Sequence, residues 1–99
     1  MEEKKREEII QLYDIYNNLL TDKQKLYFED YYYSDLSLKE ISENYEISRN
    51  AVHDQLKRTI DSLYEYENNL KLKEKMSKIE NLDINEDIKK LVLDILWEE

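Results

Sequence analysis

The chain has 99 residues, a formal net charge of −9 at pH 7, and no glycine, proline or cysteine. This composition excludes disulfide bonds and thiolate metal ligands, and it lacks the residues that form tight β-hairpin turns. We therefore expect an all-α fold: one small helical domain over residues 1–99, with packing helices at its N- and C-terminal ends.

Residues 1–18 are predicted to form an amphipathic helix. Acidic residues crowd its start, where the helix dipole favours negative charge. The charged first residues do not fit a signal peptide, and no apolar run approaches the ~20 residues of a membrane-spanning helix. The expected location is therefore the cytoplasm. The apolar residues of this segment recur at helical spacing and are Ile9, Leu12, Tyr13, Tyr16 and Leu20.

A second helix is predicted to begin after Thr21, which pairs with Gln24 in a capping box. It carries an unusually aromatic run, YFEDYYY, over residues 27–33. Such a run could serve as a platform on which unpaired bases stack, or as a tyrosine-rich core whose hydroxyls reach the surface. Stacking platforms lie in basic grooves, whereas this segment is acidic, so the core interpretation is favoured.

Residues 37–63 have the pattern of a helix-turn-helix unit. Ser37 and Glu40 form a capping box for a short helix, a two-residue connection follows, and Ser48 caps a second helix. The second helix of such a unit can lie in the major groove of DNA. The residues of this helix that are expected to face inward are Val52, Leu56, Thr59 and Leu63.

The first turns of the second helix carry the candidate contact residues. In a helix-turn-helix these positions reach base edges, which assigns Arg49, Asn50 and His53 to the groove. Lys57 and Arg58 follow nearer to the phosphates. Arginine pairs well with guanine and asparagine with adenine, so this helix is a candidate DNA reader.

The charge near this surface favours nucleic-acid binding, whereas the charge of the whole chain opposes it. Residues 48–60 carry a net charge of +2, whereas the whole chain carries −9 and would be repelled by a polyanion at long range. Asp54, in the middle of the surface, can accept a hydrogen bond from cytosine but repels phosphate. The alternative interpretation is a packing unit whose outer face is solvated or contacts a protein.

The sequence offers no catalytic constellation. Its single histidine, His53, has no cysteine and no second histidine to accompany it in nucleophilic catalysis or in a metal site. We therefore expect no enzyme activity, no cofactor and no metal.

Beyond the motif the second helix is expected to continue, with Asn68 and Asn69 as a fray or bend. Leucines recur every seven residues, which hints at a short seam for pairing with another helix, at Leu56, Leu63 and Leu70. The following segment is rich in lysines, which either contact phosphate or form a solvated helix face. These are Lys71, Lys73, Lys75 and Lys78.

A last helix is predicted over about residues 84–97, with Asp83 as its cap and Glu86 completing a capping box. This much apolar surface on a terminal helix must pack on the chain's own core or on another chain, so a homodimer is expected. The apolar stripe consists of Ile88, Leu91, Val92, Ile95 and Leu96, widened by Leu93 and Trp97.

Two resemblances follow from these motifs. Residues from about 20 to 63 resemble region 4 of bacterial sigma factors, through DKQ, the aromatic helix, LSLKEIS and ISRNAVHDQLKR. Nearly the whole chain resembles the bacterial YlxM-like helix-turn-helix family, including TDKQ, the tyrosine run, SLKEISENY and the trailing helix. The family resemblance implies an all-helical homodimer. The recognition-helix positions that it implies are Ser48, Arg49, Asn50, His53, Asp54, Lys57 and Arg58.

The same resemblance implies a role in protein targeting. Genes of the family typically neighbour those for the signal recognition particle GTPase and its receptor, so the family is thought to regulate that pathway. Three mechanisms are open. They are transcriptional regulation through duplex DNA, contact with the particle's RNA, and a protein adaptor that docks its acidic surface on a basic partner such as the signal recognition particle protein.

One residue departs from the family pattern. Glu46 stands in the turn where the family normally has glycine, which is favoured because the chain turns there through a left-handed conformation. A residue other than glycine costs about 1 kcal/mol at such a position. We expect the turn to persist with some strain, and the carboxylate to weaken nucleic-acid binding.

Overall fold

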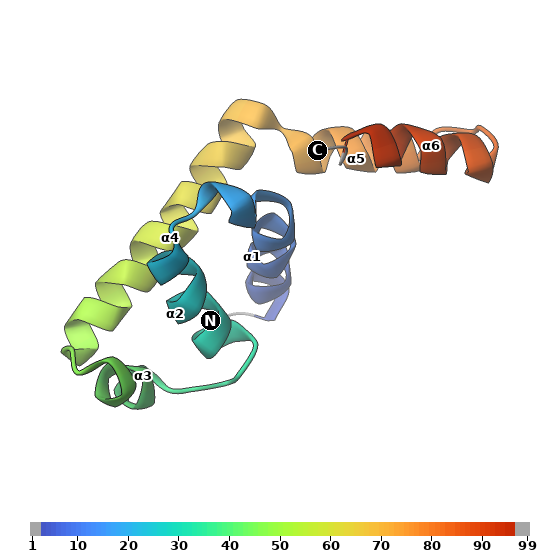
Figure 1. The fold of residues 1–99 in the computed structure, drawn as a ribbon. Helices are drawn as coiled ribbons and strands as arrows, with labels where there is room; N and C mark the ends of the chain where they lie inside the picture. The colour runs from blue at the N-terminus through green and yellow to red at the C-terminus, as the bar shows by residue number, and fades with distance from the viewer. Residues whose placement is uncertain (1–2, 97–99) are drawn as a thin grey trace.

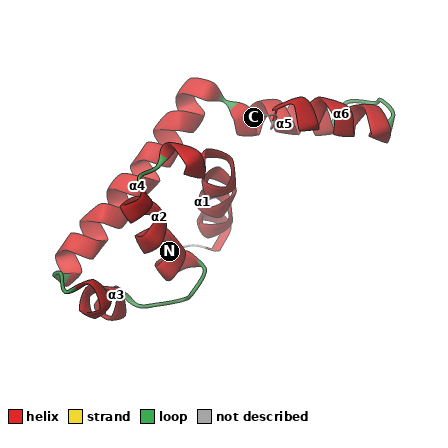
Figure 2. Ribbon diagram, in the orientation of Figure 1, coloured by secondary structure: helices red, strands yellow, loops and turns green. Residues whose placement is uncertain are grey.

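The computed structural model describes residues 3–96, and its regular structure there is helical throughout (Figures 1 and 2). The predicted all-α fold is therefore confirmed. One of these helices is far longer than the others and serves as the spine of the molecule. In chain order the elements are α1 (Glu3–Tyr16), the short 3-10 helix η1 (Asn17–Leu19), α2 (Asp22–Tyr32), α3 (Leu38–Tyr45), α4 (Arg49–Leu70), α5 (Leu72–Glu80) and α6 (Glu86–Leu96).

Helix α4 is the element on which α1, α2 and α3 all pack. Its buried leucines anchor two separate clusters, Leu63 with α1 and α2, and Leu56 with α2 and α3. The predicted seven-residue seam therefore serves the chain's own core at these two positions. Leu70, the third leucine of the seam, is 44% exposed.

The aromatic run of α2 lies in the core, as the sequence analysis favours. Phe28 is completely buried and stacks on Tyr13 of α1, with ring centroids 4.0 Å apart and planes only 7° apart. It also stacks on Tyr32 at 4.5 Å. Tyr27 is buried in the neighbouring cluster with α3 and α4. Tyr33, by contrast, is 48% exposed, so the run ends at the surface.

Buried tyrosine hydroxyls reach polar partners at the edge of the core. Tyr13 Oη donates a hydrogen bond to Glu29, and Tyr16 Oη donates one to Glu67 Oε1 at 2.6 Å. Burial, reinforced by the bond to Glu67, raises the pKa of Tyr16 to about 12. Burial likewise raises the pKa of Tyr32 to about 12. These hydroxyls therefore keep their protons at neutral pH, and the one on Tyr16 acts as a donor.

Helix α4 ends at Leu70, and the chain turns at Lys71 in a left-handed conformation with φ 55° and ψ 33°. The break therefore lies beyond Asn68 and Asn69, where the sequence places a bend. Its position is set by the side chain of Glu67, which accepts hydrogen bonds from the first backbone N–H groups of α5. This carboxylate takes the place of a capping residue, because Lys71 itself makes no side-chain cap.

Helices α5 and α6 form a hairpin that projects from the end of α4 (Figure 1). The extents of the molecule are 51 × 29 × 23 Å. Its radius of gyration is 16.1 Å, compared with about 13 Å for a compact chain of this length. We refer to α5 and α6, residues 72–96, as the arm. Among the described residues, no helix has the length and apolar character needed to cross a membrane.

The last helix begins later than the sequence predicts. Asn85, and not Asp83, provides the cap: Asn85 Oδ1 accepts a hydrogen bond from the backbone N–H of Asp87 at 2.7 Å. The helix then packs against α5, while most of its apolar stripe stays exposed. Trp97, which the sequence analysis adds to that stripe, lies outside the described residues.

Candidate nucleic-acid interface

The turn between α3 and α4 has the geometry of a helix-turn-helix. Ser37 and Glu40 make both bonds of the predicted capping box at the start of α3. Ser48 Oγ accepts a hydrogen bond from the backbone N–H of Ala51 at 3.0 Å, which caps α4 as predicted. Between the two helices Glu46 adopts φ 54° and ψ 43°, the left-handed conformation expected at this position. The backbone N–H of Ile47 donates to the Ser42 carbonyl at 3.0 Å and closes the turn.

The inward face of α4 is the one that the helical spacing predicts. Val52, Leu56, Thr59 and Leu63 are all at most 5% exposed. The hydroxyl of Thr59 donates to the Gln55 carbonyl at 2.8 Å, so this buried polar side chain has a partner within its own helix. Because this face is fixed against the core, the opposite face of α4 is fixed toward solvent.

All seven predicted contact residues are exposed. They occupy the cap and the first three turns of α4: Ser48, Arg49, Asn50, His53, Asp54, Lys57 and Arg58. His53 Nδ1 lies 3.8 Å from Asp54 Oδ1, with both side chains largely in solvent. Within residues 3–96, the cations Arg49, Lys57 and Arg58 form no ion pair with a carboxylate, so they are available to an outside ligand.

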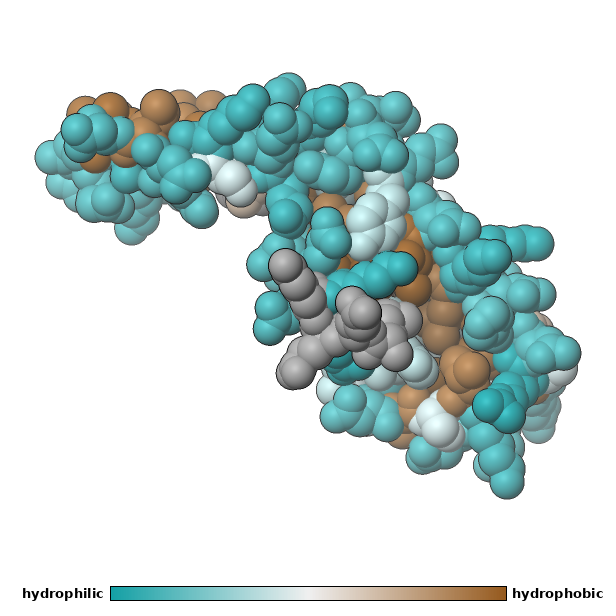
Figure 3. Space-filling model, turned by 180° about the vertical axis from the view of Figure 1, so that it is seen from behind, coloured by the Kyte–Doolittle hydropathy of each residue, from teal (hydrophilic) through white to brown (hydrophobic). Residues whose placement is uncertain are grey.

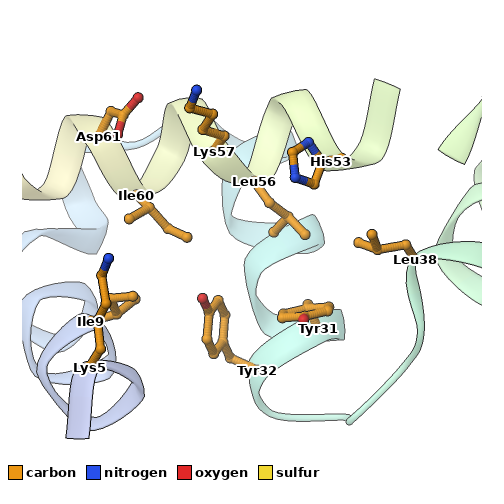
Figure 4. Close-up of a pocket in the computed structure, with 10 residues that line it drawn as sticks. All are labelled: Lys5, Ile9, Tyr31, Tyr32, Leu38, His53, Leu56, Lys57, Ile60 and Asp61. Atoms are coloured by element: carbon orange, nitrogen blue, oxygen red, sulfur yellow. The ribbon is translucent and has the colours of Figure 1, made fainter. Parts of the chain in front are cut away.

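Two of the seven residues differ from the others in what they border. His53 and Lys57 lie at the edge of a groove of about 350 Å³ between α4, α2 and the start of α1 (Figure 4). Leu56 and Ile60 point from α4 into this groove toward the tyrosines of α2. The other five residues do not line it: Ser48, Arg49, Asn50, Asp54 and Arg58. The residues that line the groove are Lys5, Ile9, Tyr31, Tyr32, Leu38, His53, Leu56, Lys57, Ile60 and Asp61.

No pattern in the sequence indicates this groove. Its lining residues come from helices far apart in the chain, such as Lys5 of α1 and His53 of α4, and no spacing within one helix signals that they meet. The aromatic run gives a partial signal, because Tyr31 is half-buried and its ring lies on the groove wall. Lys5 gives none, since it sits in a charged segment that has the pattern of a solvated helix end.

The electrostatic character of the outer face changes along α4. Its first turn contains no acidic residue, so the positive end of the helix dipole and Arg49 act together there. Farther along the same face, Asp61 and Glu65 are exposed at helical spacing from Asp54. An anionic ligand is therefore attracted to the start of α4 and repelled beyond its third turn.

Replacing Glu46 by glycine tests the strained turn. Glycine adopts the left-handed conformation without a steric penalty, so the free energy of unfolding is expected to rise by about 1 kcal/mol. Urea denaturation followed by circular dichroism measures the change. The control is Glu43→Gly in the body of α3, where glycine should destabilise by roughly 0.5–1 kcal/mol. A loss of stability in both variants would contradict the assignment of strain to Glu46.

The capped α3, the left-handed turn and the exposed start of α4 define a helix-turn-helix protein. The chain belongs to the UPF0122 family, since the family model described as "Putative helix-turn-helix protein, YlxM / p13 like" matches residues 3–96. The family resemblance drawn from the sequence is thereby confirmed.

Individual relatives come from several bacteria. The chain is 43% identical over 85 residues to a UPF0122 protein of Fusobacterium nucleatum, which covers 84% of this chain and 82% of the relative. It is 40% identical over 98 residues to a probable UPF0122 protein of Mycoplasma mycoides, covering 91% and 87%. A UPF0122 protein of Caldanaerobacter subterraneus is 46% identical over 75 residues, covering 72% and 64%.

Proposed function

We propose that this protein is a non-enzymatic regulator that binds duplex nucleic acid with the first three turns of α4. The observation that carries the proposal is the exposure of Arg49, Lys57 and Arg58 on a helix start that a capped turn holds in place. A helix with free cations and an amide-bearing side chain such as Asn50 has the groups that read base edges and phosphates.

Helix geometry favours DNA over double-stranded RNA as the ligand. The major groove of B-form DNA is wide enough to admit an α-helix, whereas the major groove of A-form RNA is deep and narrow. A helix-turn-helix therefore presents its second helix to DNA. In line with the family resemblance, the process that we propose it regulates is protein targeting by the signal recognition particle. The particle's RNA is the alternative nucleic-acid ligand.

The acidic remainder of the chain limits affinity and does not exclude binding. With a net charge of −9, the protein is repelled by DNA at long range, which slows association and lowers the affinity. At short range the three cations displace counterions from the phosphates. We therefore expect weak binding that depends on the contacts at α4 and not on a general electrostatic attraction between the protein and DNA.

The test compares the parent with Arg49→Ala/Lys57→Ala/Arg58→Ala. Fluorescence anisotropy of a labelled 20-base-pair DNA pool of random sequence is expected to show at least a 10-fold loss of affinity. Each lost phosphate contact should lower the slope of log K against log salt by about 0.9. All three side chains are exposed, so the free energy of unfolding of the variant, measured by urea denaturation, should equal that of the parent to within ~0.5 kcal/mol.

A matched control removes the same charge outside the helix-turn-helix, at Lys71 and at two lysines of the arm. Lys71→Ala/Lys75→Ala/Lys78→Ala takes away three exposed lysines that lie outside the helix-turn-helix. It should leave DNA affinity within about 2-fold of the parent. If this control variant loses as much affinity as the α4 variant, binding is spread over the surface. If the α4 variant binds as well as the parent, the proposed interface is wrong.

A protein adaptor is the second candidate, favoured by the acidic residues on the outer face of α4. Asp54, Asp61 and Glu65 are all exposed and could meet a basic partner. The test uses purified signal recognition particle protein without RNA, captured on immobilised parent chain after nuclease treatment. Capture that is lost in Asp54→Asn/Asp61→Asn/Glu65→Gln, together with no DNA binding, would favour the adaptor over the proposal.

A further inference from the structure

The groove beside α4 is an apolar surface that opens to solvent between three helices. In Figure 3 apolar atoms are visible in the body of the molecule, beside the start of α1 and along α4, with hydrophilic atoms around them. An apolar surface with a polar rim marks a binding site. The floor and walls of the groove consist of aliphatic and tyrosine side chains, namely Ile9, Tyr31, Tyr32, Leu38, Leu56 and Ile60 (Figure 4).

The arm of the same chain does not cover this groove. The arm follows Lys71, and α5 lies beside the C-terminal end of α1, where the backbone N–H of Leu72 donates a hydrogen bond to Tyr16 Oη. The groove lies at the other end of α1, beside Lys5 and Ile9. In Figure 1 the arm points away from the helix-turn-helix end of the molecule. The arm therefore does not supply an occupant for the groove.

The rim of the groove carries positive charge, although the chain as a whole carries −9. Lys5 on α1 and Lys57 on α4 are both exposed and border the groove from opposite sides. Within residues 5–96 neither lysine forms an ion pair with a carboxylate. Asp61 is the one acidic residue in the lining, so with His53 neutral the lining has a formal charge of +1. An anionic group is therefore attracted to this rim.

The charged residues next to the lining positions already have partners. Arg6 Nη2 lies 3.4 Å from Asp35 Oδ1. Glu8 Oε2 accepts a hydrogen bond from Tyr64 Oη at 3.2 Å. Asp54 Oδ1 lies 3.8 Å from the imidazole of the preceding residue and is not part of the lining. A carboxylate that enters the groove therefore meets the two lysines of the rim before any other cation.

The arrangement of apolar and charged groups favours a helix as the ligand. The stem of Lys57 lines the groove and its amine lies on the solvent side of α4, from where its flexible stem lets it reach a ligand (Figure 4). A helix in such a groove lays its apolar stripe on the floor and holds polar side chains against the rim. A site for a small molecule encloses its ligand and places polar groups among the apolar walls.

We propose that the α1–α2–α4 groove binds an amphipathic helix of a partner protein, and that carboxylates border the apolar stripe of this helix. Its apolar side chains pack on Leu56 and Ile60, and its carboxylates pair with Lys5 and Lys57. The bound helix then covers His53 and Lys57, two of the nucleic-acid contact residues. Partner and nucleic acid therefore exclude each other, a consequence that rests on the proposed function, whereas binding of the helix does not.

Two synthetic peptides of opposite charge test the proposal on the full chain. Each has about 18 residues, enough for a helix in water, with leucine at the a and d positions of the heptad. The acidic peptide has glutamate at every e and g position, and the basic peptide has lysine there. Fluorescence anisotropy of the labelled peptides is expected to show at least 10-fold tighter binding of the acidic one. General attraction to a chain of charge −9 would favour the basic peptide instead.

The groove variant Lys5→Glu/Lys57→Glu should bind the acidic peptide at least 10-fold more weakly and gain affinity for the basic one, because the rim charge is reversed. The matched control, Lys75→Glu/Lys90→Glu, makes the same charge change at exposed positions of the arm and should stay within about 2-fold of the parent. All four positions are exposed, and circular dichroism verifies that each variant keeps its helix content.

Several results would overturn the proposal. One is equal affinity of the parent for the two peptides, and another is a groove variant that keeps the parent's affinity for the acidic peptide. An acidic peptide with alanine in place of leucine should not bind, and equal binding of it would show that charge alone is recognised. Binding of sodium dodecanoate without binding of either peptide would assign the groove to a small anionic amphiphile.

A competition experiment separates this proposal from the proposed function. The acidic peptide should displace labelled DNA from the parent chain, and the alanine peptide should not. Peptide binding is also measured without DNA. A chain that binds the acidic peptide but no DNA would contradict the proposed function and support the groove proposal. Simultaneous binding of peptide and DNA would overturn the mutual exclusion.

Discussion

Replacing Phe28 by alanine is expected to lower the free energy of unfolding by about 3–5 kcal/mol. Phe28 has no exposed surface, and its ring stacks on Tyr13 of α1 and on Tyr32 of α2. The substitution removes buried apolar surface and leaves a cavity between rings that cannot collapse without breaking the stack. Total stability for a domain of this size is about 5–15 kcal/mol, so the loss is a large part of it.

Urea denaturation followed by circular dichroism measures this change, with Leu26→Ala as the matched control. Leu26 lies two residues earlier on α2 but is 52% exposed, so its loss should be much smaller, at or below about 1 kcal/mol. Phe28→Leu should fall between the two, because it keeps much of the buried volume. Similar losses for Phe28→Ala and Leu26→Ala would mean that the aromatic run is not the core.

The helix-turn-helix itself could be predicted from the sequence because its signals are local. A capping box spans four residues, and the inward face of α4 follows from one helical period. Ser37, Ser48 and Val52 therefore lie where their spacing places them. The aromatic core could also be predicted from the sequence, since the acidity of the segment argued against a base-stacking platform. Exposure of the seven candidate residues follows from the same periodicity.

Features that depend on contacts between distant segments could not be predicted in this way. The chain breaks at Lys71 because Glu67 caps α5 and is held by Tyr16, which lies 51 residues earlier. In a chain without glycine, the left-handed residue Lys71 carries no sequence signal of its own. Asp83 and Asn85 are both acceptable capping residues for α6. The connection between α5 and α6 determines which of them lies at the start of the helix.

The junction between α4 and α5 depends on one carboxylate. Glu67 Oε1 accepts hydrogen bonds from Tyr16 Oη at 2.6 Å and from the backbone N–H of Lys73 at 3.0 Å. Its other oxygen accepts from the N–H of Glu74 at 3.3 Å. Tyr16 Oη in turn accepts from the N–H of Leu72 at 3.1 Å. A single side chain therefore caps α5 and ties it to α1.

Glu67→Ala is accordingly expected to lower the free energy of unfolding by about 2–4 kcal/mol, the combined cost of a lost cap and of hydrogen bonds to a charged acceptor. Glu67→Gln keeps one acceptor oxygen and should lose roughly half as much. The control is Glu65→Ala, which removes an exposed carboxylate two residues away. Urea denaturation gives these differences.

Amide hydrogen exchange distinguishes a local effect at this junction from general destabilisation. In Glu67→Ala the amides of Leu72, Lys73 and Glu74 should exchange at least 10-fold faster, because their acceptors are lost or released. Amides in the middle of α4 should change only by the global loss of stability. Unchanged exchange at residues 72–74 would show that Glu67 does not hold the arm. The direction of the arm would then need another anchor.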